Sequence, residues 1–167
     1  MTEVTFQGDN IQLSGTFPKT GTQAPDFTLC GSDLSDVNLS SLKGKKVVLN
    51  IFPSIDTPVC ALGVKAFNEK AAGVNNTVVL CISADLPFAT GRFCAAEGIE
   101  NVQTASFFRN AEFTNAYGVK IAEGALRELA TRAVVVINEE GTVIYSELVA
   151  EITEEPNYDA AISVLEK

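Results

Sequence analysis

The segment from Lys46 to Cys60, KVVLNIFPSIDTPVC, decides the fold of this chain. Its first half, Val47 to Phe52, is an apolar run rich in β-branched residues and has the length of a buried strand. Pro53 ends that strand, and a polar loop follows it. Pro58 fits the first position of a helix, where its missing N–H costs no hydrogen bond, and the two residues before it can cap that helix. A buried strand followed directly by a helix is typical of an α/β protein.

Strand and helix patterns continue on both sides of this segment. The middle of the chain alternates strand and helix, and this predicts a central mixed sheet flanked by helices. With no repeat and no linker, we expect one domain over residues 1–167, with a β-hairpin at residues 1–15. The expected strands are at 4–6, 11–13, 27–30, 37–39, 47–52, 77–83, 102–105, 133–137 and 142–149, and the expected helices begin at 58, 84, 111 and 157.

Composition excludes several classes of function. The 167 residues include 21 acidic and 12 basic side chains, a net charge of −9, which argues against nucleic acid or a membrane surface as the main partner. The chain has no histidine, so no Ser–His or Cys–His mechanism is possible and no metal can be bound through imidazole.

The four cysteines, at positions 30, 60, 81 and 94, are widely spaced and form no C-x-x-C pair. No apolar run reaches the ~20 residues that span a bilayer, and the first ten residues do not resemble a signal peptide, so we expect a cytoplasmic protein. Thiols are kept reduced there, which favours catalytic, redox-active or buried cysteines. We expect no cofactor and no metal, although a cluster of thiolates around a metal remains an alternative.

Cys60 is the strongest candidate for chemistry. It follows a predicted strand and is about the third residue of the next helix, where unpaired N–H groups and the helix dipole favour a thiolate. Thr57 lies three residues earlier, so its hydroxyl can reach the sulfur or an incoming oxygen. The alternative is that Cys60 is simply a small buried residue on the inner face of the helix.

Pro53, Thr57 and Cys60 fill the pattern P-x-x-x-T-x-x-C, the active-site motif of the peroxiredoxins. The chain resembles one branch of that family, the atypical two-cysteine bacterial thiol peroxidases, over its whole length. The resemblance implies a thioredoxin-like α/β fold with an added N-terminal hairpin. Besides the motif, it is carried by TVVLCISADLPFATGRFC at 77–94, RAVVVI at 132–137 and EITEEPNYDAAISVL at 151–165.

The resemblance assigns roles to the site residues. Cys60 matches the peroxidatic cysteine, Thr57 the hydroxyl that holds the peroxide, and Pro53 the ring that shapes the pocket. Arg132 matches a distant arginine that folds back against the thiolate, although position alone would make it a surface residue. Arg109 also lies in a segment that resembles the family, and we assign it no role.

Cys94 matches the resolving cysteine. The apolar stripe expected on its helix is Ala89, Phe93 and Ala96, and Cys94 lies about 100° away from Phe93, which fits a thiol that can meet a sulfenic acid. The alternative is a harmless surface thiol. Cys81, inside an apolar strand, is expected in the core, and so is Cys30.

The implied function is reduction of hydrogen peroxide and alkyl hydroperoxides through a Cys60–Cys94 disulfide, recycled by thioredoxin, in a homodimer that serves antioxidant defence. Ile55, Leu62 and Phe88 are apolar residues expected near the site, where they can favour alkyl substrates. Two other classes remain open: a thiol-based redox sensor, and a noncatalytic domain that binds a small ligand or a protein.

Overall fold

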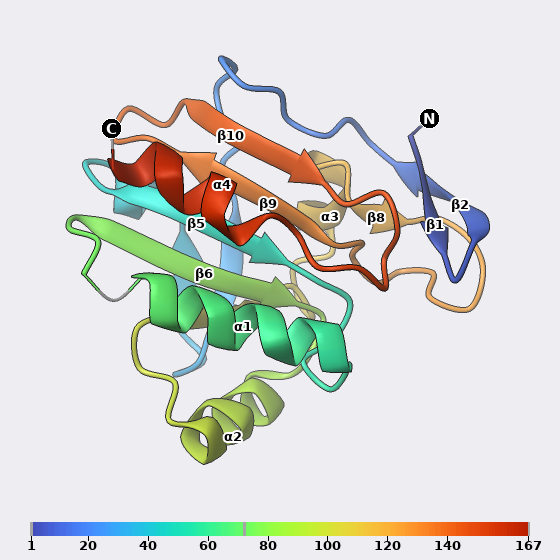
Figure 1. The fold of residues 1–167 in the computed structure, drawn as a ribbon, viewed down its shortest axis with the longest axis horizontal. Helices are drawn as coiled ribbons and strands as arrows, with labels where there is room; N and C mark the ends of the chain where they lie inside the picture. Colours follow the sequence, from blue (N-terminus) through green and yellow to red (C-terminus); the bar gives the residue numbers. More distant parts are fainter. Residues whose placement is uncertain (1, 72, 167) are drawn as a thin grey trace.

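A computed structural model describes residues 2–71 and 73–166 of the chain (Figure 1). Its centre is a seven-stranded mixed sheet in the order β10-β9-β5-β6-β7-β3-β4, and a second sheet has the order β1-β2-β8. The strands are β1 Glu3–Phe6, β2 Asp9–Ser14, β3 Thr28–Gly31, β4 Asp36–Asn38, β5 Lys46–Ile51, β6 Thr77–Ser83, β7 Gln103–Ser106, β8 Lys120–Ile121, β9 Ala133–Ile137 and β10 Val143–Leu148. The helices are α1 Pro58–Ala71, α2 Pro87–Glu97, α3 Glu112–Ala116 and α4 Tyr158–Ser163, with short 3-10 turns at Ser40–Leu42 and Val164–Glu166.

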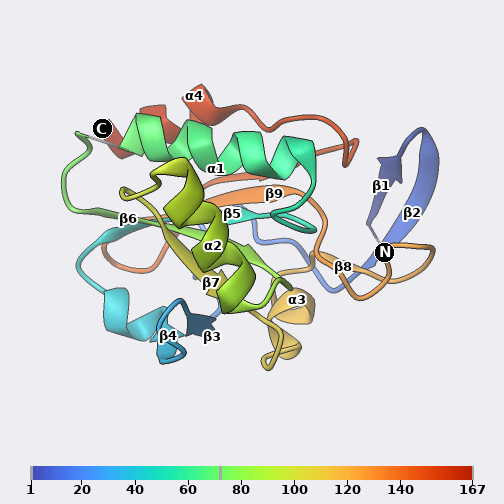
Figure 2. The same ribbon diagram turned by 90° about the horizontal axis from the view of Figure 1, so that it is seen from below.

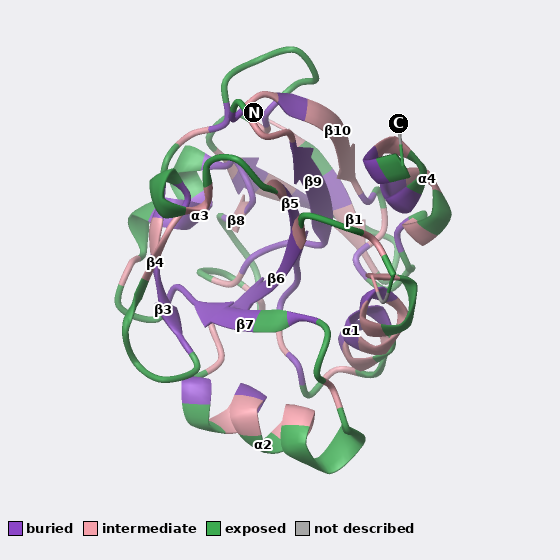
Figure 3. Cartoon of the chain, turned by 90° about the vertical axis from the view of Figure 1, so that its left-hand side faces the viewer, coloured by how far each residue is buried: buried purple, intermediate pink, exposed green. Residues whose placement is uncertain are grey.

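Helices cover both faces of the large sheet, as the sequence predicts. Helices α1 and α4 lie side by side on one face, and α3 lies on the other (Figure 2). Strand β5 is apolar on both of its faces because each face packs against a core. Leu49 and Ile51 belong to the core on the α3 side, and Val48 belongs to the core under α1 and α4. The inner strands β5, β6 and β9 are accordingly buried along almost their whole length (Figure 3).

The N-terminal hairpin β1–β2 stands at one end of the molecule (Figures 1 and 2) and is held there by a late segment of the chain. Thr5 N donates to Ala150 O at 2.7 Å, and Ile152 N donates to Thr5 O at 2.8 Å. The side chain of Ile152 is buried among Val4 and Leu13 of the hairpin and Ile121 of β8. We call residues 150–153 the strap, because they fasten the hairpin to the rest of the fold.

Most predicted elements are confirmed to within one or two residues. Strand β8 was not predicted, since it has only two residues and depends on pairing with Leu13 and Ser14 of β2. The apolar stripe predicted for α2 is only partly correct. Phe93 packs against the core under α1 and Ala89 is half-buried, whereas Ala96 is exposed, and the buried residues of the helix are Pro87 and Thr90.

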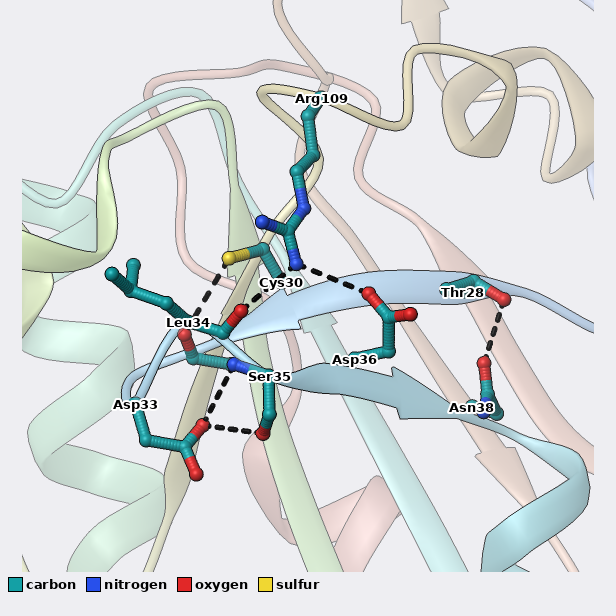
Figure 4. Close-up of polar contacts among 9 residues, drawn as sticks. Thr28, Cys30, Asp33, Leu34, Ser35, Asp36, Asn38 and Arg109 are labelled. Atoms are coloured by element: carbon teal, nitrogen blue, oxygen red, sulfur yellow. Dashed lines mark hydrogen bonds and ion pairs between the residues drawn. The ribbon is translucent and has the colours of Figure 1, made fainter.

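Arg109 has a structural position in this fold (Figure 4). Its guanidinium donates to Leu34 O at 2.9 Å and pairs with the Asp36 carboxylate at 3.1 Å. Arg109 follows β7, and both partners lie in the β3–β4 hairpin, so this arginine ties the hairpin turn to the segment that follows the neighbouring strand β7. Within the described residues, no helix is long and apolar enough to cross a membrane.

Candidate active site

Cys60 is the third residue of α1, at the edge of the sheet where β5 ends. It is only 1% exposed and packs in the core under α1 with Phe52, Val64 and Phe67. Its helix position agrees with the prediction that first-turn N–H groups and the helix dipole lie beside the sulfur. A thiol so well buried reacts only through the opening that its neighbours leave.

Arg132 reaches this sulfur from directly before β9. Its Nη1 donates to Cys60 Sγ at 3.3 Å, and its Nε donates to Ile152 O at 2.8 Å. The side chain is 4% exposed, so it is a buried arginine and not the surface residue that its position alone suggested. A guanidinium stays protonated at any ordinary pH, so the sulfur has a permanent positive charge beside it.

Thr57 and Pro53 lie in the loop between β5 and α1. Thr57 Oγ1 donates to Ser54 O at 2.8 Å, and therefore does not donate to the sulfur. Its oxygen can still accept a hydrogen bond from an incoming O–H group. Both residues line a cavity of about 280 Å³, which also exposes part of Arg132; we call it the Arg132 cavity.

Most of the wall of the Arg132 cavity is apolar and comes from distant parts of the sequence. The hairpin contributes Phe6 and Gln7, the strap contributes Ile152 and Thr153, and the segment after β8 contributes Leu126 and Leu129, next to Ser54 of the β5–α1 loop and Pro58 and Val59 at the start of α1. Among these described lining residues, Arg132 alone is charged.

The apolar residues expected near the site do not line this cavity. Ile55 is buried in the core under α1, and Leu62 and Phe88 are exposed large side chains. Of the residues close to Cys60 in sequence, three from the β5–α1 loop and the first two of α1 line the cavity, and the rest of its wall comes from the hairpin, the strap and the segment after β8. Proximity in sequence to the cysteine was therefore an incomplete guide to this surface.

Glu151 locks the strap that positions Arg132. Its carboxylate accepts from Thr5 Oγ1 at 3.0 Å, from Gly8 N at 2.9 Å, and from both the N and Oγ1 of Thr153 at 2.8 Å. These donors, chiefly the two backbone N–H groups, lower the pKa of Glu151 from 4.5 to about 2. The next residue is Ile152, whose carbonyl accepts from Arg132. The hairpin is therefore linked to the guanidinium through Glu151 and its neighbour Ile152.

Tyr158 is a second neighbour that the sequence did not reveal. Burial raises the pKa of its hydroxyl. The Glu155 carboxylate, which accepts from this hydroxyl at 3.1 Å, raises the pKa further, and the positive charge of Arg132 lowers it. Gly63 of α1 makes room for this ring: a Cβ there would come 3.3 Å from Tyr158 Oη. A glycine at position 63 therefore leaves the space that the Tyr158 ring occupies.

Cys94 lies on α2 and lines a different cavity, of about 500 Å³, between α2 and the β3–β4 turn. All four thiols are free, so the structure shows Cys60 and Cys94 in separate places. Cys94 is half-buried and lies four residues after buried Thr90, so it is on the side of α2 that carries Pro87 and Thr90. This agrees with its predicted place away from Phe93, and the structure adds that this side of the helix is buried. Burial raises the pKa of Cys94.

Cys81 and Cys30 are fully buried in β6 and β3, as predicted. Burial raises the pKa of Cys81 to about 12, although Asn50 Nδ2 donates to its sulfur at 3.6 Å. Cys81 therefore stays a neutral thiol. Among the residues that the structure describes, no three Cys, His, Asp or Glu side chains gather as a metal-binding group.

Comparison with known proteins shows the family to which the chain belongs. The Redoxin family model matches residues 19–162. A thiol peroxidase of Vibrio cholerae is 54% identical over 162 residues, covering 97% of this chain and 99% of that protein. A peroxiredoxin-like protein from Aquifex aeolicus superposes with a TM-score of 0.94 at 42% identity, over 99% of this chain and 96% of the other. A thiol peroxidase from Chromobacterium violaceum gives 0.89 at 23% identity, over 98% and 95%, and so shows the fold.

A thioredoxin-like sheet with a buried cysteine at the start of a helix and an arginine against its sulfur defines the class of thiol-dependent oxidoreductases. With the relatives above, the chain belongs to the thiol peroxidase branch of the Redoxin family.

The Glu151 network predicts a pH-dependent loss of stability in Glu151→Gln. Because folding lowers the pKa of this carboxyl, its contribution is complete above about pH 4.5 and is lost as the pH falls towards about 2. Urea unfolding should therefore show the variant less stable than the unmodified chain at pH 7, with the difference shrinking below pH 4.5. Glu154→Gln, at an exposed strap neighbour, is the matched control and should change little. An equal loss for both variants, or a loss independent of pH, would contradict the assignment.

Proposed function

We propose that this chain is a peroxidase in which the Cys60 thiolate reduces hydrogen peroxide and organic hydroperoxides. The observation that carries the proposal is the 3.3 Å contact between Arg132 Nη1 and Cys60 Sγ beside a cavity that both Arg132 and Thr57 enter. Thiolate is the reactive form of cysteine, and a helix start and a guanidinium stabilise it without a histidine.

In the first step, the Cys60 thiolate attacks the terminal oxygen of the hydroperoxide. An S–O bond forms while the O–O bond breaks, so that sulfur loses two electrons and the peroxide gains them. The leaving alkoxide or hydroxide takes a proton from solvent, and Cys60 becomes a sulfenic acid. In this step Arg132 stabilises the negative charge on sulfur and on the breaking O–O bond, Thr57 accepts the hydroperoxide O–H, and Pro53 limits access of water.

In the second step, Cys94 attacks the sulfenic sulfur, a disulfide forms and water leaves. A disulfide requires Cα atoms within about 7 Å, and the two thiols start on separate helices, Cys60 in the core under α1 and Cys94 at the cavity beside the β3–β4 turn. The start of α1 or part of α2 must therefore unfold locally during turnover. The helix α2 is suited to this because Gly91 lies inside it and Gly98 ends it.

An external dithiol then reduces the disulfide by exchange, and we propose thioredoxin as that reductant. The proposal includes a homodimer, a cytoplasmic location and one domain over residues 1–167. Membership of the family supports a peroxide substrate and a thiol reductant. Thioredoxin as the reductant, the homodimer and the cytoplasmic location are proposed from the resemblance.

The Arg132 cavity supports alkyl hydroperoxides as good substrates. Its wall of Phe6, Leu126, Leu129 and Ile152 offers apolar surface to a substrate chain, while Arg132 and Thr57 are placed for the peroxide group. Burial of apolar surface is worth about 25 cal/mol per Å², so a substrate tail gains affinity that hydrogen peroxide lacks.

The cysteine roles are tested by adding one equivalent of peroxide and mapping the products by mass spectrometry. We expect a Cys60–Cys94 disulfide in the unmodified chain, no oxidation in Cys60→Ser, and a sulfenic acid without an internal disulfide in Cys94→Ser. Turnover with thioredoxin and thioredoxin reductase should disappear in both variants. A Cys60–Cys81 disulfide, or activity in Cys60→Ser, would refute the assignment. A redox sensor would instead react with peroxide only as slowly as an ordinary thiol.

The cavity wall predicts a selective effect of Phe6→Ala. Removing the ring takes apolar surface from the substrate tail but leaves Arg132 and Thr57 in place. We expect kcat/KM for cumene hydroperoxide to fall about tenfold, equivalent to about 1.4 kcal/mol, with that for hydrogen peroxide changing less than twofold. Phe108→Ala, which removes an exposed ring outside this cavity, is the control. An equal loss for both peroxides would show that Phe6 supports the fold and not the substrate.

The raised pKa of Cys94 predicts how the second step responds to pH. Because the thiol is mostly protonated near neutrality, the rate of disulfide formation should rise by up to tenfold per pH unit as the pH increases towards that pKa. Rapid-quench mass spectrometry after mixing with excess peroxide follows this step between pH 6 and 9. A flat profile would mean that unfolding of the helices, and not ionisation of Cys94, limits the rate.

A further inference from the structure

Asp85 lies at the meeting point of the two loops that the proposed chemistry must move. Strands β5 and β6 are parallel neighbours, so their carboxyl ends share one edge of the sheet. The loop after β5 leads to Cys60, and the short loop after β6 leads to α2 and Cys94. Phe52 N donates to Ile82 O at 3.1 Å, so the pairing of the two strands continues one residue past the end of β5.

The Asp85 carboxylate is bonded to both loops. Its Oδ1 accepts from Ser54 Oγ at 2.8 Å, and its Oδ2 accepts from Ile55 N at 2.6 Å and from Ser83 Oγ at 2.7 Å. Two of these donors belong to the loop before Cys60, and the third ends β6. The carboxylate replaces the hydrogen bonds that the backbone of an irregular, half-buried loop would otherwise lack.

The same network continues to Thr57. Ser54 O accepts from Thr57 Oγ1 at 2.8 Å and from Thr57 N at 3.1 Å, and Ser54 Oγ also accepts from Asp56 N at 3.2 Å. Ser54 is therefore held by Asp85 on one side and holds Thr57 on the other. The orientation of the Thr57 hydroxyl at the Arg132 cavity thus depends on the Asp85 carboxylate.

We propose that Asp85 is a positioning residue that sets Thr57 for the peroxide step and ties the loop before Cys60 to the start of α2. The proposal rests on the peroxidase function above for its kinetic consequence. Holding both loops helps the first step, which needs Thr57 in place. It opposes the second step, which needs the same segments to unfold.

The sign of the effect separates positioning from simple electrostatics. A carboxylate near a thiolate disfavours the negative charge on sulfur, so loss of that charge alone would leave the first step unchanged or make it faster. Loss of positioning makes the first step slower. Asp56 provides a matched control, because it is exposed in the same loop and its side chain makes no hydrogen bond or ion pair among the described residues.

The experiment compares Asp85→Asn with Asp56→Asn by rapid-quench mass spectrometry, which times sulfenic acid and disulfide formation separately. For Asp85→Asn we expect sulfenic acid formation about tenfold slower and disulfide formation unchanged or faster, and for Asp56→Asn both steps within twofold of the unmodified chain. The double variant Ser54→Ala with Asp85→Asn should be no slower than Asp85→Asn alone, since both changes break one network.

The proposal is overturned if Asp56→Asn slows the first step as much as Asp85→Asn, if both steps slow by the same factor, or if the Ser54 and Asp85 effects multiply. Should Asp85→Asn fail to fold, Ser83→Ala removes one donor and keeps the charge, and a first step unchanged in it would also overturn the proposal. Amide hydrogen exchange gives a readout without peroxide: Ile55 and Thr57 should exchange faster in Asp85→Asn and not in Asp56→Asn. That result decides the positioning role even if the unmodified chain proves unreactive and the peroxidase function fails.

Discussion

The buried guanidinium of Arg132 is the constraint on which the rest of the site depends. A charged group taken out of water is costly unless it is paired and hydrogen-bonded. Here Nε has the Ile152 carbonyl and Nη1 has the Cys60 sulfur, so the charge is best matched when that sulfur is a thiolate. In a chain with a net charge of −9, the cavity wall contributes this one cation at the point where negative charge develops. Arg132 thus gives the site a positive charge although the protein as a whole is acidic.

The missing histidine makes sense in this setting. An imidazole beside Cys60 would titrate near neutral pH and would supply its charge only part of the time. A guanidinium, the first turn of α1 and the N–H groups of its loop supply positive potential that does not depend on pH. The cost is that Arg132 must be held in one orientation by a carbonyl 20 residues further along the chain, and the strap and the hairpin keep that carbonyl in place.

The sequence was a good guide wherever a pattern is local. The strand–Pro–loop–Pro–helix order around Pro53 and Pro58 predicted β5, α1 and the place of Cys60 in the first turn. It was only partly right for the face of α2, because Pro87 and Thr90 are buried there beside the packed ring of Phe93, whereas Ala96 is exposed. It did not indicate that Glu151, Tyr158 or Asp85 belongs to the site. Each of them acts through hydrogen bonds or burial between segments that are distant in sequence, and a single acidic residue or tyrosine in a polar stretch has no recognisable sequence pattern. The resemblance identified Arg132, which periodicity alone would have left on the surface.

The pairing of Thr5 with the strap has a consequence for how the protein is made. The bonds from Thr5 to Ala150 and Glu151 join residues 145 and 146 positions apart, near the two ends of the chain. During synthesis the hairpin emerges long before the strap with which it pairs. Ile152, whose carbonyl orients Arg132, also follows both Cys60 and Arg132 in the sequence, so a growing chain carries Cys60 before its guanidinium is held in place. The positive charge that stabilises the thiolate therefore depends on a contact that forms only after the strap has been made and has folded against the hairpin.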